Sequence, residues 1–317
     1  MKYIISEKQF EPHVRMRKWF YRLVFWLLAL LLLLALVQEA DWHLTFSSLM
    51  EVPVWVLMAC TLGWLSSFLF RACRFKTEWQ AHGKISLWDS LSLTLMHNAA
   101  VVLVPFRVGE LGYPVLVQKL LNVSFQQCIR SLLWLRFQDG IVLLVLAFLL
   151  LPYFSAEWRI ACVLLGLTLF FILKKKWLRL LRSRHFLIRQ VRAFLHQRSN
   201  AWGWIWSASN WIVKLIVVSL LLSNLTSLDT LQTVRGALTG ELSALLPLTG
   251  PAGFGTYEAG VWAGLGLSWK DMKGLMGSIL LTHMFFLCIS LLGAVVALSF
   301  NSFALENFKS KQNGAHV

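Results

Sequence analysis

The feature of this sequence that most constrains its fold is a cluster of prolines and glycines inside an otherwise apolar stretch, residues 245–258. The stretch contains two prolines, three glycines and one carboxylate, Glu258. Proline and glycine interrupt a helix and free backbone polar groups, and such a break is tolerated at membrane depth only where protein or water surrounds it. The stretch therefore predicts a protein-lined cavity inside a membrane.

A second stretch of the same kind lies at residues 102–114. Both stretches follow a short apolar run, reach a proline and continue through glycine to a glutamate, which is Glu110 in the earlier stretch. Paired apolar segments that are interrupted by proline and glycine are the best sequence indication of a transporter binding site. We therefore expect such a site between the two interrupted segments.

The composition is that of a membrane protein. Hydrophobic residues make up 57% of the 317 residues and charged residues 14%, and the mean hydropathy is +0.64. The longest polar stretch, residues 174–198, is too short for an independent catalytic fold. We predict an all-α polytopic membrane protein with a single transmembrane domain over residues 1–317.

The net charge of +15 does not indicate binding to nucleic acid. The basic residues concentrate in a few short loops, as membrane orientation requires. The sequence shows no P-loop, no H-E-x-x-H or paired-cysteine metal motif and no readable Ser-His-Asp set. We expect no nucleic acid partner, no metal, no cofactor and no enzymatic activity.

About six segments are predicted to span the membrane as helices. The two interrupted segments, residues 91–121 and 236–267, differ from them, because neither limb of the first can cover a hydrocarbon core of ~30 Å. The predicted spans are residues 19–37, 52–70, 131–151, 158–173, 203–223 and 274–300.

The basic residues decide how the interrupted segments are placed. The loop predicted after the second span, with Arg71 and Arg74, and the basic loop 174–198 are both expected on the cytoplasmic side. They share that side only if the first interrupted segment is a re-entrant hairpin. The predicted topology has both termini in the cytoplasm and two re-entrant hairpins. The chain then forms an inverted repeat, with repeat A at about 52–151 and repeat B at about 203–300.

Seven ionisable residues lie inside the predicted membrane segments. Each costs at least ~2.5–3.5 kcal/mol at a helix centre, and such residues by default mark a function with a nearby partner. They are Arg107, Glu110, Arg136, Asp139, Lys214, Glu241 and Glu258.

Two of these residues, Arg136 and Asp139, stand three positions apart and so share one helical face. They form either a structural ion pair or a phosphate site, because the planar guanidinium fork matches phosphate oxygens. Lys214 is either a partner for Glu241 or Glu258 or a second positive charge for an anionic headgroup.

The two breaks supply further candidates. Helices that start there aim free N–H groups at the cavity, which suits an anion; a glycine turn capped by a glutamate is the alternative. His97, Asn98 and His283 are interpreted as satisfied polar residues of the core. The candidates at the breaks are Arg107, Gly109, Glu110, Gly253, Gly255 and Glu258, with Glu241, Tyr113 and Tyr257 as secondary ones.

Three motifs together resemble the flippase-like transmembrane family of lysylphosphatidylglycerol synthases, here without a synthase domain. They are the motif from Pro105 to Glu110, the motif from Arg136 to Asp139, and the run from Pro247 to Glu258. The family's first motif is usually followed by a further arginine, where this sequence has Gly112-Tyr113-Pro114. In the second, Leu135 replaces the family's glutamate.

The resemblance implies movement of an anionic or aminoacylated phospholipid, or a polyprenyl-phosphate-linked precursor, between the leaflets of a bacterial or archaeal inner membrane. In this role Arg107, Arg136 and Lys214 would receive the phosphate, and the acids would balance charge or carry protons. An accessory or scaffold subunit of an envelope glycosyltransferase or lipid-modifying enzyme is the main alternative, and a membrane-embedded headgroup transferase is a third. The expected partners are membrane lipids, envelope-biosynthesis enzymes and a second copy of the chain.

Overall fold

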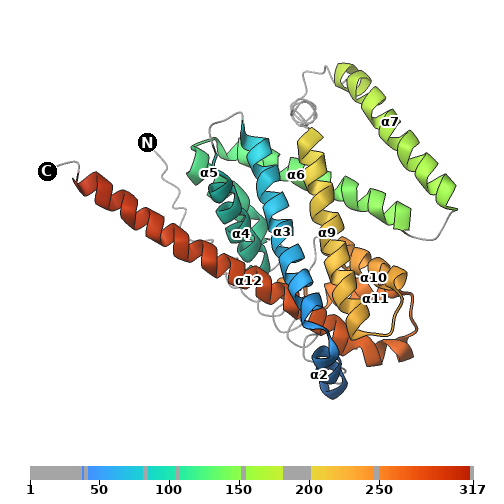
Figure 1. The fold of residues 1–317 in the computed structure, drawn as a ribbon. Helices are drawn as coiled ribbons and strands as arrows, with labels where there is room; N and C mark the ends of the chain where they lie inside the picture. The colour runs from blue at the N-terminus through green and yellow to red at the C-terminus, as the bar shows by residue number, and fades with distance from the viewer. Residues whose placement is uncertain are drawn as a thin grey trace, which may run out of the picture.

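The chain is an all-α membrane protein (Figure 1). A computed structural model describes residues 38, 42–80, 85–104, 108–150, 155–180, 201–245 and 250–314. The predicted span 19–37 lies outside these residues, as do Pro105, Arg107 and Pro247. The elements are α2 (Trp42–Glu51), α3 (Val54–Trp79), α4 (Leu87–Leu103), η2 (Val108–Leu111), α5 (Gly112–Leu121), α6 (Phe125–Leu150), α7 (Ala156–Leu180), α9 (Ala201–Leu225), α10 (Thr230–Ser243), η3 (Pro251–Gly253), α11 (Thr256–Leu265) and α12 (Trp269–Gly314).

Four stretches of helix are long and apolar enough to cross a membrane. They are Val54–Trp79, Phe125–Leu150, Ala201–Leu225 and Gly274–Ser299, and they match four of the predicted spans. The predicted span 158–173 lies within α7, which is not among the four. The count of six spans therefore stays a prediction.

The first interrupted segment turns back on itself. A Cβ on Gly109 would overlap the backbone of Ala100, so only glycine allows η2 to lie this close to α4. The ring of Tyr113 on α5 lies 5.6 Å from that of His97 on α4. The chain therefore returns along α4 as an antiparallel helical pair, which we call the first hairpin. Its entry and exit on one membrane face stay a prediction.

The second interrupted segment also turns back. Gly236 and Gly240 of α10 face Val261 of α11, and Gly260 and Gly264 of α11 face the backbone of α10. Small residues at such an interface allow two helices to approach closely, as in membrane helix pairs. Helices α10 and α11 are therefore packed face to face, and we call them the second hairpin.

The core lies where α3, α9 and α12 pack together. The ring of Trp64 on α3 stacks on Phe286 of α12 at 4.3 Å, and its Nε1 donates to Ser290 at 3.0 Å. Gly63 of α3 packs against Val217 of α9. Figure 1 shows α12 crossing α3 and α4.

The order of elements repeats: a long helix, a hairpin and a long helix occur first as α3 to α6 and again as α9 to α12. The predicted repeats A and B, at about 52–151 and 203–300, stay a prediction. The inverted orientation of the two repeats stays a prediction.

Candidate functional site

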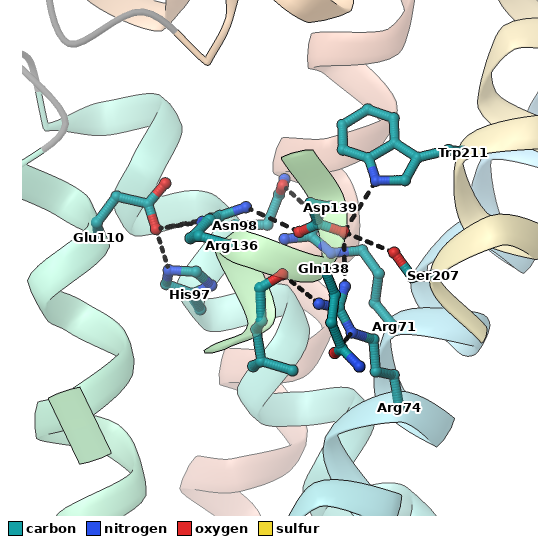
Figure 2. A network of polar contacts seen from close by, with 11 residues as sticks. Arg71, Arg74, His97, Asn98, Glu110, Arg136, Gln138, Asp139, Ser207 and Trp211 are labelled. Carbon is teal, nitrogen blue, oxygen red and sulfur yellow. Dashed lines mark hydrogen bonds and ion pairs between the residues drawn. The ribbon is translucent and has the colours of Figure 1, made fainter. Parts of the chain in front are cut away.

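A buried polar network lies where α3, α4, α6 and α9 meet, and the carboxylate of Asp139 is at its centre (Figure 2). Asp139 accepts from Arg74 Nη1 at 2.6 Å, Trp211 Nε1 at 2.8 Å and Ser207 Oγ at 2.9 Å. Arg136 lies farther away, at 3.5 Å. Asp139 is 5% exposed. Four donors surround this carboxylate and hold it in place.

Arg136 bonds more closely to the first hairpin than to Asp139. Its Nη2 and Nε donate to Oε2 of Glu110 at 2.6 and 3.0 Å. The predicted pair of Arg136 and Asp139 exists, but each residue has a closer partner. Glu110 therefore ties the tip of the first hairpin to α6.

Two arginines of the network were predicted in a loop after the second span, and the prediction of a loop there is wrong. Helix α3 continues to Trp79, so Arg71 and Arg74 lie within it. Arg74 is 5% exposed and donates to Asp139, to Gln138 Oε1 and to the carbonyl of Leu135. The signal that was missed is their spacing of three residues, which places both on one helical face.

Arg71 differs from the other two arginines of the network. It donates to Asn98 Oδ1 at 3.2 Å, and in the described part of the chain no carboxylate lies within 4 Å of its nitrogens. Arg74 and Arg136 each have at least one carboxylate within that distance. Arg71 is therefore the arginine with the most capacity for an added anion.

The arginines surround a small cavity of about 40 Å³. A water needs about 10–15 Å³ of such space, so the cavity holds a few waters or a few oxygens of a ligand. Three guanidinium groups against the carboxylates of Asp139 and Glu110 leave the region positive. The lining is Arg71, Arg74, Phe75, Leu93, Thr94, His97, Tyr113, Leu132, Leu135, Arg136 and Asp139.

His97 lines this cavity, and Asn98 bonds to one of its arginines. His97 is buried, and its Nε2 lies 3.4 Å from Oε2 of Glu110 without a hydrogen bond. Asn98 holds Arg71. The apolar sequence around these two residues hid their role, because their partners lie on other elements.

Tyr113, a secondary candidate, lines the same cavity. Its hydroxyl is 2.9 Å from Ser131 Oγ and accepts from Trp79 Nε1 at 2.9 Å. These bonds hold α5 against α3 and α6.

The second hairpin carries a separate buried pair. Glu258 is fully buried, its Oε2 accepts from the N–H of Gly255 at 2.6 Å, and its Oε1 lies 2.6 Å from Nδ1 of His283. Gly253 and the ring of Tyr257 pack against the same imidazole. The capping role considered for Glu258 is present, but it uses one oxygen, and His283 was missed as the partner of the other.

Lys214 pairs with Glu241 and not with Glu258. Its Nζ lies 2.8 Å from Oε1 of Glu241, and 4.6 and 4.8 Å from the ring centres of Trp64 and Trp211. This ammonium is therefore already neutralised and enclosed by aromatic faces. Neither Lys214 nor Glu258 lines the arginine cavity.

The predicted pool of charges is therefore divided into an arginine network, a Lys214–Glu241 pair and a Glu258–His283 pair. Arg107 is not placed, since it lies outside the described residues. Within the described ranges, no group of three or more His, Cys, Asp or Glu side chains is suited to a metal ion.

Comparison with known proteins gives one match. The family model described as the lysylphosphatidylglycerol synthase TM region matches residues 19–294. No curated protein and no solved structure matches the chain.

Proposed function

Because the chain belongs to the lysylphosphatidylglycerol synthase transmembrane family, we propose that it moves a phosphate-bearing lipid between membrane leaflets. The lipid would be an anionic or aminoacylated phospholipid or a polyprenyl-phosphate-linked precursor. The chain would act as a transporter and not as an enzyme, in a bacterial or archaeal inner membrane with both termini in the cytoplasm.

The observation that carries this proposal is the arginine cavity. Arg71, Arg74 and Arg136 converge on it inside a membrane domain, and Arg71 has no carboxylate within 4 Å among the described residues. Guanidinium groups bind phosphate oxygens through two parallel hydrogen bonds. A lipid phosphate would bind first at Arg71 and then compete with Glu110 for Arg136. The side chain of Arg136 is 28% exposed, more than that of either carboxylate with which it pairs.

A second, apolar cavity supports a lipid as the ligand. It has a volume of about 620 Å³ and lies between α6, α7 and α9. Ile141 and Val142, in its lining, lie two and three positions after Asp139 on α6. Trp204 and Ala208 of α9 lie beside Ser207 of the polar network. The same two helices therefore carry a polar site for a headgroup and an apolar space for a tail.

Reconstituted vesicles test the proposal. Fluorescent phosphatidylglycerol or a fluorescent polyprenyl phosphate is placed in one leaflet, and its transfer is followed by quenching. We expect Arg71→Gln to slow transfer roughly ten- to hundredfold, which corresponds to a hydrogen bond to a charged group of about 1.5–3 kcal/mol. The control is Arg130→Gln on α6, whose arginine bonds to the carbonyl of Gln126 outside the cavity. No transfer of any probe above that of empty vesicles would overturn the proposal.

The four hydrogen bonds that Asp139 accepts favour a second candidate function. A carboxylate with four donors is also what a purely structural network contains, as expected for a scaffold subunit of an envelope glycosyltransferase or lipid-modifying enzyme. Under this function Arg136→Gln lowers expression and melting temperature without a selective loss of transport. A folded Arg136→Gln protein that has lost lipid transfer excludes it.

A further inference from the structure

We infer that the buried pair of Glu258 and His283 binds the proton that drives lipid movement, so that transport is coupled to a proton gradient. This inference rests on the proposed transport function and adds its energy source. It is carried by the contacts and the electrostatic surroundings of the pair at the tip of the second hairpin.

The pair is tightly built and closed to solvent. Glu258 is 0% exposed, and the His283 side chain is 9% exposed. The imidazole lies between the rings of Phe254 and Tyr257, with centroid distances of 4.9 and 4.4 Å. The Glu258 Oε1 and His283 Nδ1 atoms are 2.6 Å apart, so a hydrogen bond joins the acid and the imidazole.

No fixed positive charge compensates Glu258. In the described part of the chain, no lysine or arginine lies within 4 Å of its carboxylate. Without the extra proton, Glu258 is a carboxylate beside a neutral imidazole, and the pair carries one negative charge. With it the pair is neutral, either as carboxylate and imidazolium or as carboxylic acid and imidazole. Burial of an uncompensated charge is costly, and the extra proton removes that net charge from the closed tip.

The neighbouring ionisable groups are engaged elsewhere. From α10, Glu241 acts electrostatically on Tyr257, but its carboxylate is held by Lys214 of α9. Helix α4 contacts η3, and its buried histidine, His97, faces Glu110. At the start of α12, Asp271 is bonded to Ser268 and is exposed. The proton on Glu258 and His283 is therefore the charge that changes locally.

The backbone of the tip links this charge to shape. Ala252, Gly253 and Gly255 have positive φ values of 52°, 89° and 83°, a conformation that is costly for alanine. The N–H of Gly255 is held by Glu258, the residue that gains or shares the proton. Loss of the proton would leave a net negative charge buried in the closed tip, which is costly. Opening of the tip to water therefore accompanies release of the proton.

A transport assay with a pH gradient tests the coupling. Vesicles of phosphatidylethanolamine and phosphatidylglycerol carry the full-length protein and fluorescent phosphatidylglycerol. A step that requires one bound proton changes in rate by up to about tenfold per pH unit, and we expect this dependence in the wild type. Glu258→Gln keeps an acceptor for Gly255 and nearly the same shape, so it should transfer lipid at a rate that the gradient does not change. Asp271→Asn is the control and should keep the dependence.

The outcomes separate the two proposals. Wild-type transfer that ignores the gradient, or a gradient dependence that persists in Glu258→Gln, overturns the proton inference and leaves lipid transport standing. Infrared difference spectra of the purified protein between acidic and alkaline buffer give a readout that needs no transport. We expect a carboxyl or imidazole band change that is present in the wild type and Asp271→Asn and absent from Glu258→Gln and His283→Gln. Identical spectra for wild type and Glu258→Gln overturn the inference.

Discussion

The tips of the two hairpins combine the same residue types, a glutamate that follows glycine and faces a histidine, but they compensate the glutamate differently. Glu110 lies 3.4 Å from His97 and 2.6 Å from Nη2 of Arg136. Glu258 lies 2.6 Å from His283, and no arginine or lysine among the described residues is within 4 Å. Arginine keeps its charge at any physiological pH, whereas histidine does not. The first tip therefore suits a permanent anion site, and the second suits a titratable one.

The two hairpins also differ in what holds them together. The first depends on polar bonds to its neighbours, through Glu110 and Tyr113. The second depends on glycines that let α10 and α11 touch, such as Gly240 and Gly264. Removal of a charge should therefore damage the first hairpin most, and addition of a methyl group should damage the second.

The largest loss of stability is expected when Arg74, the most buried arginine of the network, is replaced. Arg74→Gln leaves Asp139 without its closest positive charge and should lower the free energy of unfolding by about 3–5 kcal/mol, as breaking of a buried ion pair does. Thermal unfolding in detergent measures the loss, with Arg130→Gln as the control. If the free energies of unfolding of Arg74→Gln and Arg130→Gln agree within error, Asp139 is not held as the structure shows.

A smaller effect separates the two glutamates directly. Glu110→Gln removes the carboxylate closest to Arg136 and should cost roughly 1.5–3 kcal/mol, the range for a hydrogen bond to a charged group. We expect this variant to retain the dependence of lipid transfer on a pH gradient, whereas Glu258→Gln should lose it. Transfer rates measured with and without a gradient check the comparison. If both variants lose the dependence, the two tips are not distinct in function.

The two hairpins were predictable because their cause is local. Prolines and glycines that cluster in a short stretch disfavour a continuous helix, so the interruptions at 102–114 and 245–258 indicated where the chain turns. The ionisable residues Asp139 and Glu258 were likewise identified from their rarity in apolar surroundings. These predictions needed no knowledge of tertiary contacts.

The pairing of charges was not predictable, because partners come from distant segments. Glu110 and Arg136 are 26 positions apart, and Glu258 and His283 are 25 apart. A histidine in an apolar run has the same local sequence whether it is a satisfied core residue or the partner of a buried acid. Arg71 was assigned to a loop, since hydropathy alone ends the helix at the first charge and does not register the buried Phe75 and Trp79 beyond it.

The packing of the second hairpin gives the next prediction. A Cβ on Gly264 would overlap Thr239 and the carbonyl of Arg235, so Gly264→Ala should destabilise the protein by about 1–3 kcal/mol, as overpacking does. Gly274→Ala is the matched control, because nothing lies within 4 Å of its Cβ position. Unfolding in detergent compares the two variants. Equal stability would show that α10 and α11 are not in close contact.

The smallest effect compares the tyrosines of the two tips. The hydroxyl of Tyr113 bonds to Trp79 and Ser131, whereas no hydrogen bond of the Tyr257 hydroxyl is present among the described residues. Tyr113→Phe should therefore cost about 1 kcal/mol, the net value of a typical hydrogen bond, and Tyr257→Phe should leave stability nearly unchanged. Both substitutions remove one oxygen and keep the ring, so a difference in their unfolding free energies reports the bonds of the first tip alone. A Tyr257→Phe variant as unstable as Tyr113→Phe would mean that the second tip also depends on polar bonds, and the contrast between the hairpins would then rest on their charges.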